Sequence, residues 1–241
     1  MLDKLQPWDA LLKKILWKQL GEITNKRILD FGSGTGVTAN YFARKNELIA
    51  IEPSEESVND SWKENDYTQL VGSTDELRKL ETESFDRIFC HNVLEYATDR
   101  QEIVKEFNRL LKPEGTLSIV KHNRPGRVMQ MTVLLNDFDH AHALLDGEDG
   151  ASSQYGTIHY YEDEDILRWC TGFEIQKVMG IRTFWDLQQN QELHKDPQWQ
   201  EKMVEIEMRV AEMEEYRSIA FFHHLLCSKK GNYSGTMCGN Q

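Results

Sequence analysis

A glycine-rich turn between a short apolar strand and a helix is the feature that most constrains the fold of this chain. The turn DFGSGTG occupies residues 30–36, after a predicted buried strand over residues 26–31 and before a predicted helix over residues 37–44. Glycines at such a turn let the backbone bend sharply and approach a ligand, and the first amide groups of the helix offer hydrogen-bond donors. Residues 47–52 form a second apolar strand, so the turn belongs to a βαβ unit.

The alternation of helices and strands continues along the first half of the chain. A helix is predicted over residues 9–20, ahead of the first strand. Further helices are predicted over residues 55–64 and 100–111, and further strands over residues 69–71, 85–91 and 116–121. Right-handed crossovers bring the carboxyl ends of parallel strands to one edge, so the pattern predicts a doubly wound α/β sheet.

The alternation stops after residue 121. Residues 122–160 carry clusters of Asn, Asp, Gly and Ser without a clean strand, which is typical of a lid or a substrate loop. The remaining elements are predicted as a helix over residues 162–170, a strand over 173–184, a helix starting at Pro197 and a late antiparallel strand over 218–228. We expect one domain over residues 1–230, with cap insertions at about 122–165 and 185–215 and a flexible tail over 231–241.

The charge and the cysteines exclude several classes of protein. The formal net charge of −12 disfavours broad, non-specific binding of nucleic acid, although residues 121–127 (KHNRPGR) form a local basic patch. The four cysteines have no metal-ligand or disulfide spacing, so neither a zinc site nor a disulfide framework is expected. Neither a membrane-spanning run nor a cleavable leader is found, so we expect a cytoplasmic protein. We also expect it to be a monomer or a homodimer.

An acidic residue at the end of the second strand suggests what the glycine turn binds. Glu52 lies 20 positions beyond Gly32 (52 − 32), where a carboxylate can accept both hydroxyl groups of a ribose. Val37 occupies the last glycine position of the dinucleotide fingerprint GxGxxG, which disfavours pyrophosphate binding. The glycines by themselves could also form an ordinary strand-to-helix turn that binds nothing. Their spacing relative to Glu52 favours a binding site for a nucleotide-like cofactor.

The motif D-x-G-x-G-x-G resembles the first motif of class I S-adenosylmethionine-dependent methyltransferases, and the resemblance continues through Gly72 to Asp75 and through the predicted strand 85–91. It implies a Rossmann-like seven-stranded methyltransferase sheet with a helical substrate cap, and S-adenosyl-L-methionine as the cofactor. The implied cofactor-binding residues are Asp30, Gly32, Ser33, Gly34, Gly36, Glu52, Pro53, Ser73, Thr74, Asp75, His91 and Asn92. Asp75 has an alternative role as the cap of a helix that begins at Glu76.

Within that superfamily the chain resembles the tRNA 5-carboxymethoxyuridine methyltransferases, which esterify a wobble uridine. The segments that carry this resemblance are His91 to Tyr96, Asn123 to Asp139 and Gly180 to Phe184. The chain departs from the family in an acidic segment over residues 146–165 and in Phe221-Phe222, where the family pattern has an arginine. The resemblance implies a tRNA acceptor.

A carboxylate acceptor makes modest chemical demands. It is already anionic at neutral pH, so catalysis needs only positioning beside the methyl group and a cation to hold the acceptor. The predicted cations and donors are Arg182 and, in the basic loop, Lys121, His122, Arg124 and Arg127, because all of them lie at the ends of strands that finish at the cofactor edge. His91 is predicted to line the methyl pocket or to act as a base for a hydroxyl acceptor. The alternatives are that the basic loop is an ordinary solvated connection and that His91 is structural.

These residues leave three functions open. The first is methyl transfer to a carboxylate oxygen of a modified tRNA wobble uridine. The second is methylation of a small molecule at oxygen or nitrogen, which the net charge and the acidic cap favour. The third is a non-catalytic nucleotide-binding partner subunit that has kept the glycine turn. No metal is expected in any of them.

Overall fold

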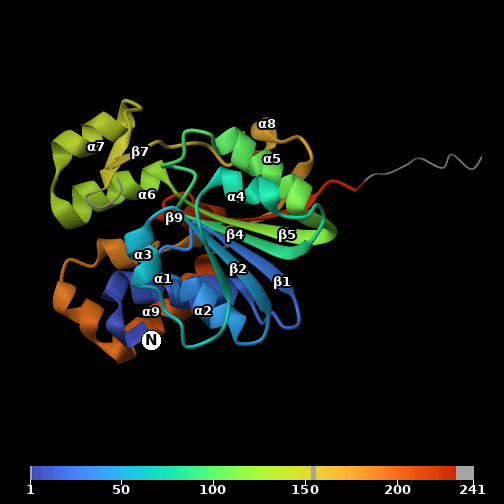
Figure 1. The fold of residues 1–241 in the computed structure, drawn as a ribbon. Coiled ribbons are helices and arrows are strands. Elements are labelled where there is room, and N and C mark those ends of the chain that lie inside the picture. The colour runs from blue at the N-terminus through green and yellow to red at the C-terminus, as the bar shows by residue number, and fades with distance from the viewer. Residues whose placement is uncertain (1, 153–155, 232–241) are drawn as a thin grey trace, which may run out of the picture.

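The computed structural model describes residues 2–152 and 156–231 and contains one seven-stranded sheet (Figure 1). Its strand order is β3-β2-β1-β4-β5-β9-β8, and all strands are parallel except β9. The strands are β1 (Arg27–Phe31), β2 (Glu47–Glu52), β3 (Thr68–Val71), β4 (Phe85–His91), β5 (Leu111–His122), β8 (Phe173–Ile181) and β9 (Phe222–Lys229). The predicted doubly wound sheet with a late antiparallel strand is confirmed.

Helices cover both faces of the sheet, as Figure 1 shows. One face packs against α1 (Pro7–Leu20), α2 (Val37–Ala43) and α9 (Pro197–Val210), and the other against α4 (Thr74–Lys79), α5 (Arg100–Leu110) and α8 (Asp165–Trp169). The short helices α3 (Glu55–Asn59) and α10 (Glu214–Arg217) lie in connections. Alternate strand residues point to opposite faces, so Ile28 joins the α1 core while Leu29 joins the α5 core.

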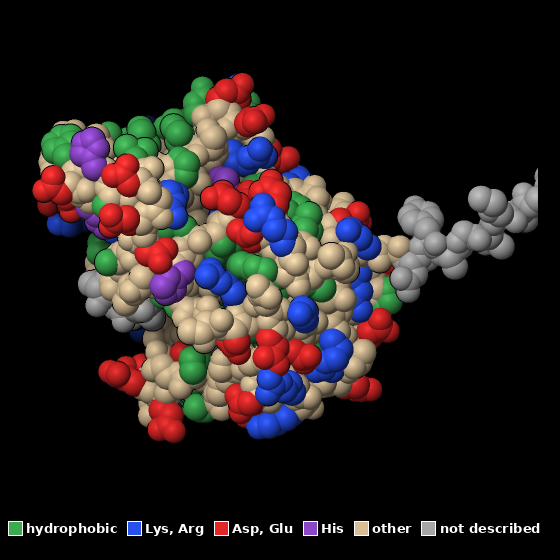
Figure 2. Space-filling model, turned by 90° about the horizontal axis from the view of Figure 1, so that it is seen from above, with side chains coloured by type: hydrophobic (Ala, Val, Ile, Leu, Met, Phe, Trp, Pro, Cys, Tyr) green, Lys and Arg blue, Asp and Glu red, His purple; other side chains and the backbone are tan. Residues whose placement is uncertain are grey.

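A cap projects from the carboxyl edge of the sheet, at the left of Figure 1. It consists of α6 (Arg124–Met129), the π-helix η2 (Gln130–Leu135), α7 (Phe138–Leu145) and a hairpin of β6 (Gly150–Ser152) and β7 (Gly156–Ile158). The hairpin corrects the expectation that residues 122–160 hold no clean strand; each of its strands has three residues, too few to show an alternating pattern. Figure 2 shows apolar side chains gathered on this cap, where Phe138 and Leu145 are more than half exposed.

Several predicted boundaries differ from the structure. The strand predicted over 116–121 already begins at Leu111, and the helix predicted over 162–170 begins at Asp165. The helix predicted over 55–64 ends at Asn59, where Asn, Asp and Ser side chains compete for backbone hydrogen bonds. The strand predicted over 173–184 ends at Ile181, because Arg182 adopts a left-handed φ of +63°. The strand predicted from residue 218 starts at Phe222, after α10 and its final turn. The short 3-10 helices are η1 (Leu2–Lys4), η3 (Trp185–Leu187) and η4 (Gln191–Lys195).

Membrane-spanning helices and metal-ligand clusters are both absent from the described ranges. None of the helices in the described ranges is long and apolar enough to cross a membrane. Over the same ranges, no group of three or more His, Cys, Asp or Glu side chains is arranged to hold a metal ion. The expected tail over 231–241 lies outside the described residues except for Gly231.

Candidate active site

The glycine turn lies at the carboxyl edge of the sheet between β1 and β2. Gly32, Gly34 and Gly36 all have left-handed φ angles, of +73°, +54° and +70°. A Cβ atom on Gly32 would lie 2.2 Å from Cγ2 of Val93, so the close packing of this turn requires glycine. A Cβ atom on Gly34 would meet nothing within 4 Å, so the turn presents an open backbone face at that point.

Glu52 links the end of β2 to the glycine turn. Its carboxylate accepts hydrogen bonds from the amides of Gly34 at 2.8 Å and Ser54 at 3.0 Å, and the residue is 8 % exposed. Each carboxylate oxygen has a second lone pair, so the group can hold the turn and still accept ribose hydroxyl groups. The position of Glu52 was predicted from the sequence, whereas its contact with Gly34 was not.

Asp30 is a buried carboxylate beneath the turn. Burial raises its pKa to about 6, although the Lys13 ammonium and an amide hydrogen bond from Ala39 act in the opposite direction. Its Oδ2 atom has no hydrogen-bond partner among the described residues. Lys13, from α1, donates to the Thr38 hydroxyl at 2.8 Å. Sequence reasoning missed Lys13; the available signal was that it lies four positions before the buried Trp17 on the same face of the helix.

Two more buried polar atoms near this edge have no partner in the described part of the chain. They are Ser33 Oγ, in the turn, and Asn92 Oδ1, directly after β4. Asn92 has a left-handed φ of +57°, and its amide donates to the carbonyl of Val120 at 2.8 Å. Together with Asp30 Oδ2 they form a set of polar atoms that fits the amine, carboxylate and hydroxyl groups of an amino-acid-containing nucleoside.

The residues predicted at the adenine edge lie at the start of α4. Asp75 Oδ1 accepts from the Ser73 amide at 3.1 Å, and backbone hydrogen bonds lower the pKa of this exposed carboxyl. Thr74 Oγ1 donates to Asp99 at 2.6 Å, while Pro53 is exposed directly after β2. The helix begins at Thr74 and not at Glu76, so Ser73 occupies the cap position, and Asp75 lies inside the first turn and accepts from the cap residue's amide. The role of Asp75 toward an adenine stays a prediction.

His91 ends β4 and is held by a buried chain of hydrogen bonds. Its Nε2 lies 2.8 Å from Ser118 Oγ, which lies 2.8 Å from His224 Nε2, and His224 Nδ1 lies 2.8 Å from Gln19 Oε1. Burial lowers the pKa of His91 well below its ordinary value, so the imidazole is neutral. Its Nδ1 atom is buried without a partner among the described residues. The adjacent His223 and His224 of β9 point to opposite faces of the sheet, His224 toward Ser118 and His223 toward Asp163, so they do not bind one metal ion together.

Arg182 lies at the predicted edge but is paired. Ile181 of β8, Phe222 of β9 and His122 of β5 are aligned in register, which places Arg182 beside the start of the cap. The Arg182 guanidinium forms a bidentate ion pair with Asp186, and its centre lies 4.5 Å from the Phe221 ring. Sequence reasoning expected an unpaired cation here.

Arg124 and Lys121 each have partners of their own. The Arg124 guanidinium donates to the carbonyls of Glu148 at 2.6 Å and Leu144 at 3.2 Å, and thereby caps α7. Lys121 points to the α5 face, because side chains alternate along β5, and its ammonium lies 3.2 Å from Asp163. Whether Arg124 contacts an acceptor stays a prediction.

Arg127, which was predicted with its neighbours in the basic loop to lie at the cofactor edge, lines a cavity of about 440 Å³ together with Arg182. Burial lowers the pKa of Arg127, and its Nε atom has no partner among the described residues. The neighbouring His122 Nδ1 and Tyr160 hydroxyl are also buried without partners. Burial lowers the pKa of His122 to about 3, so this ring is neutral. Arg127 also donates from Nη1 to Gln130 Oε1, but none of the described carboxylates pairs with it. The cavity thus contains one arginine without a carboxylate partner, and the unpaired atoms of His122 and Tyr160 lie near it.

Glu95 is a buried carboxylate next to His122. Burial raises its pKa to about 7, although amide hydrogen bonds, including one from His122 at 2.6 Å, favour the charged form. Nothing in the sequence pattern marked Glu95 as ionisable near neutral pH, because its burial depends on the cap residues His159 to Tyr161 packing over it.

Comparison with known proteins identifies the class. Residues 29–119 match the family model described as a methyltransferase domain. The chain is 30 % identical over 174 residues to the ubiquinone biosynthesis O-methyltransferase of Xanthomonas euvesicatoria pv. vesicatoria, covering 66 % of this chain and 67 % of the relative. The chain belongs to the S-adenosylmethionine-dependent methyltransferases, with S-adenosylmethionine as its cofactor.

Two further similarities extend over more of the chain. It is 26 % identical over 237 residues to the tRNA 5-carboxymethoxyuridine methyltransferase of Escherichia coli K12, covering 91 % of this chain and 88 % of that protein. An S-adenosylmethionine-dependent methyltransferase from Mesorhizobium loti has the same fold, with a TM-score of 0.57, 15 % identity and coverage of 95 % of this chain and 100 % of that chain.

Replacing Glu52 by alanine is expected to weaken S-adenosylmethionine binding by about 2 to 3 kcal/mol, because charge-assisted hydrogen bonds to the ribose are lost and Gly34 is released. Isothermal titration calorimetry measures the change. Glu47→Ala is the matched control, since Glu47 is the exposed carboxylate at the other end of β2 and pairs with Arg27. Equal affinities of the two variants would remove Glu52 from the cofactor site.

Proposed function

We propose that this methyltransferase transfers the methyl group to a carboxylate oxygen of a modified uridine in tRNA, and that it does so in the cytoplasm. One observation carries the proposal. Arg127 Nε, His122 Nδ1 and the Tyr160 hydroxyl oxygen are three buried atoms without hydrogen-bond partners among the described residues. Arg127 lines the cavity together with Arg182 and Phe221, and the His122 ring lies 5.5 Å from the Phe221 ring and 6.5 Å from the Tyr160 ring. A carboxylate is the acceptor that such a group of donors binds best.

The residues of the chain have limited tasks in this reaction. The bound cofactor supplies an electrophilic methyl group on a sulfonium. Arg127 and the neutral donors hold the carboxylate, while Asp186 balances the charge of Arg182. A carboxylate needs no general base, so positioning accounts for the rate.

The acidic segment over residues 146–165 is compatible with an RNA acceptor, because several of its charges are balanced locally. Asp163 pairs with Lys121 at 3.2 Å, and Asp165 pairs with Arg168. Burial alone would raise the pKa of Asp163, but His223 and Lys121 together lower it to about 2. The similarity to the Escherichia coli tRNA methyltransferase also covers the segment that forms the cap.

A second candidate is methylation of a hydroxyl group, with His91 as the base. The neutral His91 has a buried Nδ1 atom without a partner among the described residues, which can accept a proton. Relatives of this chain include ubiquinone biosynthesis O-methyltransferases.

The stability of the product separates the two candidates. The purified enzyme is incubated with methyl-labelled S-adenosylmethionine and either tRNA that carries wobble carboxymethoxyuridine or a series of small acids and phenols. A carboxylate product is a methyl ester, which mild alkali hydrolyses to methanol, whereas a methyl ether withstands alkali. We expect alkali-labile label in tRNA and a steep fall of the initial rate with added salt. Alkali-stable label, or label in small molecules alone, contradicts the proposal.

A further inference from the structure

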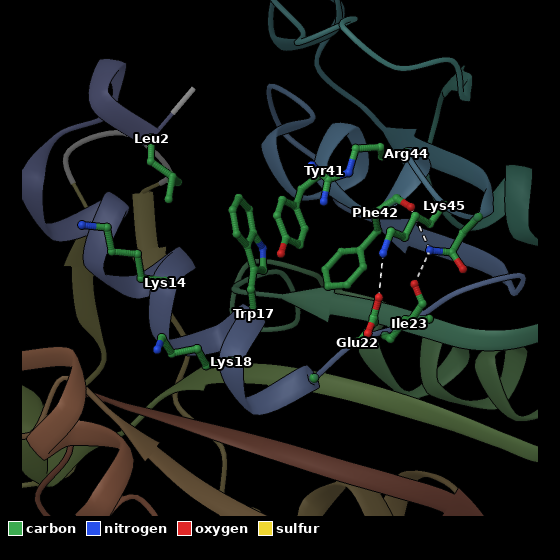
Figure 3. A pocket seen from close by; sticks show the side chains of 12 residues that line it. Leu2, Lys14, Trp17, Lys18, Glu22, Ile23, Tyr41, Phe42, Arg44 and Lys45 are labelled. Carbon is green, nitrogen blue, oxygen red and sulfur yellow. Dashed lines mark hydrogen bonds and ion pairs between the residues drawn. The ribbon is translucent and has the colours of Figure 1, made fainter. Parts of the chain in front are cut away.

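A second cavity lies at the edge of the sheet opposite the glycine turn. Its volume is about 540 Å³, and it is enclosed by the second half of α1, the loop over residues 21–23 and the end of α2 (Figure 3). The strands β1 and β2 begin at this edge, whereas the cofactor site lies where they end. The cavity is therefore separate from the active site.

One wall of this cavity is aromatic. Trp17 of α1 and Tyr41 of α2 are stacked, with ring centroids 3.7 Å apart and an interplanar angle of 10° (Figure 3). Phe42 meets Tyr41 edge-on at 5.0 Å, and the Arg44 guanidinium lies 5.8 Å from the Tyr41 ring centre. Aromatic walls of this kind accept the planar face or edge of a nucleobase.

The back of the cavity is held by hydrogen bonds. Asn46 Nδ2 donates to the carbonyls of Ile23 at 2.9 Å and Phe42 at 2.8 Å, and Asn46 Oδ1 accepts from the Lys26 amide at 2.9 Å. These bonds join the loop after α1 to the end of α2. The cavity is thus formed before any ligand arrives, which lowers the entropic cost of binding.

The rim of the cavity is positive, in contrast to the rest of the molecule. Four cations line it, which are Lys14, Lys18, Arg44 and Lys45. The lining contains one acid, Glu22, which pairs with Lys45 at 2.6 Å, so the lining has a net charge of +3 (four minus one). In the described part of the chain, no carboxylate lies within ion-pair distance of Lys18 or Arg44. A chain of net charge −12 therefore concentrates cations without carboxylate partners beside a partly buried tyrosine, Tyr41.

We propose that this cavity binds a nucleotide of the RNA acceptor, with the base against Tyr41, one phosphate group at Arg44 and a neighbouring phosphate group at Lys18. The inference rests on the proposed function. Helix α1 connects the two sites, because Trp8 lines the acceptor cavity and Trp17 lines this one. Nine helical residues separate them by about 14 Å along the axis, a distance that a few nucleotides span. An RNA strand can therefore occupy both cavities at once.

Charge reversal tests this second contact. The variant Lys18→Glu/Arg44→Glu is compared with the control Lys105→Glu/Lys202→Glu, which changes the net charge equally at exposed positions on α5 and α9. Fluorescence anisotropy measures binding of tRNA at several salt concentrations, and calorimetry of S-adenosylmethionine binding verifies that both variants fold. At about 50 mM salt the cavity variant is expected to bind tRNA at least about tenfold more weakly than the control. Its slope of log affinity against log salt is expected to fall by about 1.4, for two lost phosphate contacts.

Equal weakening of tRNA binding in both variants overturns the proposal, because the change in net charge alone then explains the loss. A wild-type protein that binds no tRNA also overturns the proposal. Equilibrium dialysis with AMP tests the other source of a nucleotide. In one outcome, the cavity variant no longer binds AMP but binds tRNA as well as the control variant does. This result assigns the cavity to a free nucleotide and overturns the RNA contact. Binding is measured without methyl transfer. A wild type that binds tRNA through this cavity but leaves no alkali-labile label on it refutes the proposed reaction alone.

Discussion

Arg182→Ala is expected to lower the free energy of unfolding by about 3 to 5 kcal/mol, the largest stability effect of a single substitution that we anticipate. The reason is Asp186, whose side chain is only 5 % exposed and which loses its bidentate partner. Asp186 keeps one hydrogen bond, from Gln130 Nε2 at 2.7 Å, which cannot balance its charge. Urea denaturation followed by circular dichroism measures the loss.

Two companion variants locate the effect in the buried pair. Arg182→Ala/Asp186→Ala is expected to recover part of the stability, because no unpaired charge remains. Arg168→Ala removes a pair of the same type whose arginine is 67 % exposed, and it is expected to cost less than about 1 kcal/mol. A loss below about 1 kcal/mol in Arg182→Ala would show that Asp186 does not depend on this arginine. Activity of the variant is interpreted only after its folded fraction is known.

Arg127→Ala is expected to lower kcat/KM for a carboxylate acceptor by about 100- to 1000-fold, or about 3 to 4 kcal/mol. Arg127 is the cation of the acceptor cavity that no carboxylate of the described residues neutralises, so an acceptor anion gains most from it. Its guanidinium also lies 5.7 Å from the Phe221 ring centre, which fixes its direction. Steady-state rates with methyl-labelled S-adenosylmethionine provide the measurement.

Cofactor affinity serves as the control for Arg127, because the glycine turn and Glu52 lie on β1 and β2, away from α6. The dissociation constant for S-adenosylmethionine should stay within about twofold of the wild type. Arg127→Lys keeps the charge but loses the planar fork, so it is expected to restore only part of the rate. An unchanged rate in Arg127→Ala, with intact folding, would place the acceptor elsewhere.

The local patterns of the chain allowed the cofactor half of the molecule to be predicted. The residues 30–36 and Glu52 are close in sequence and are joined by one βαβ unit, whose geometry is nearly invariant. Strand and helix periodicity over the first half of the chain predicted a parallel, doubly wound sheet for the same reason, whereas the order of its strands came from the structure. The role of Asp75 was ambiguous, and in the structure α4 begins one residue before it, with Ser73 at the cap position.

The acceptor half depended on contacts between residues far apart in the chain. Arg182 follows its strand as predicted, yet its neutralisation by Asp186 requires a left-handed turn that periodicity does not report. Arg127 stands out only because the cap buries it beside Phe221, which directly precedes β9.

The sequence by itself therefore determined the sheet, the glycine turn and the class of cofactor, because each depends on short-range pattern and on backbone conformations that few residues permit. The tertiary structure alone decided which cations are neutralised and which are free to bind an anion. It also decided which histidines are neutral, and it brought α1 and α2 together around the second cavity. Burial and pairing arise from long-range packing, and they set the pKa of a side chain more strongly than its sequence neighbours do.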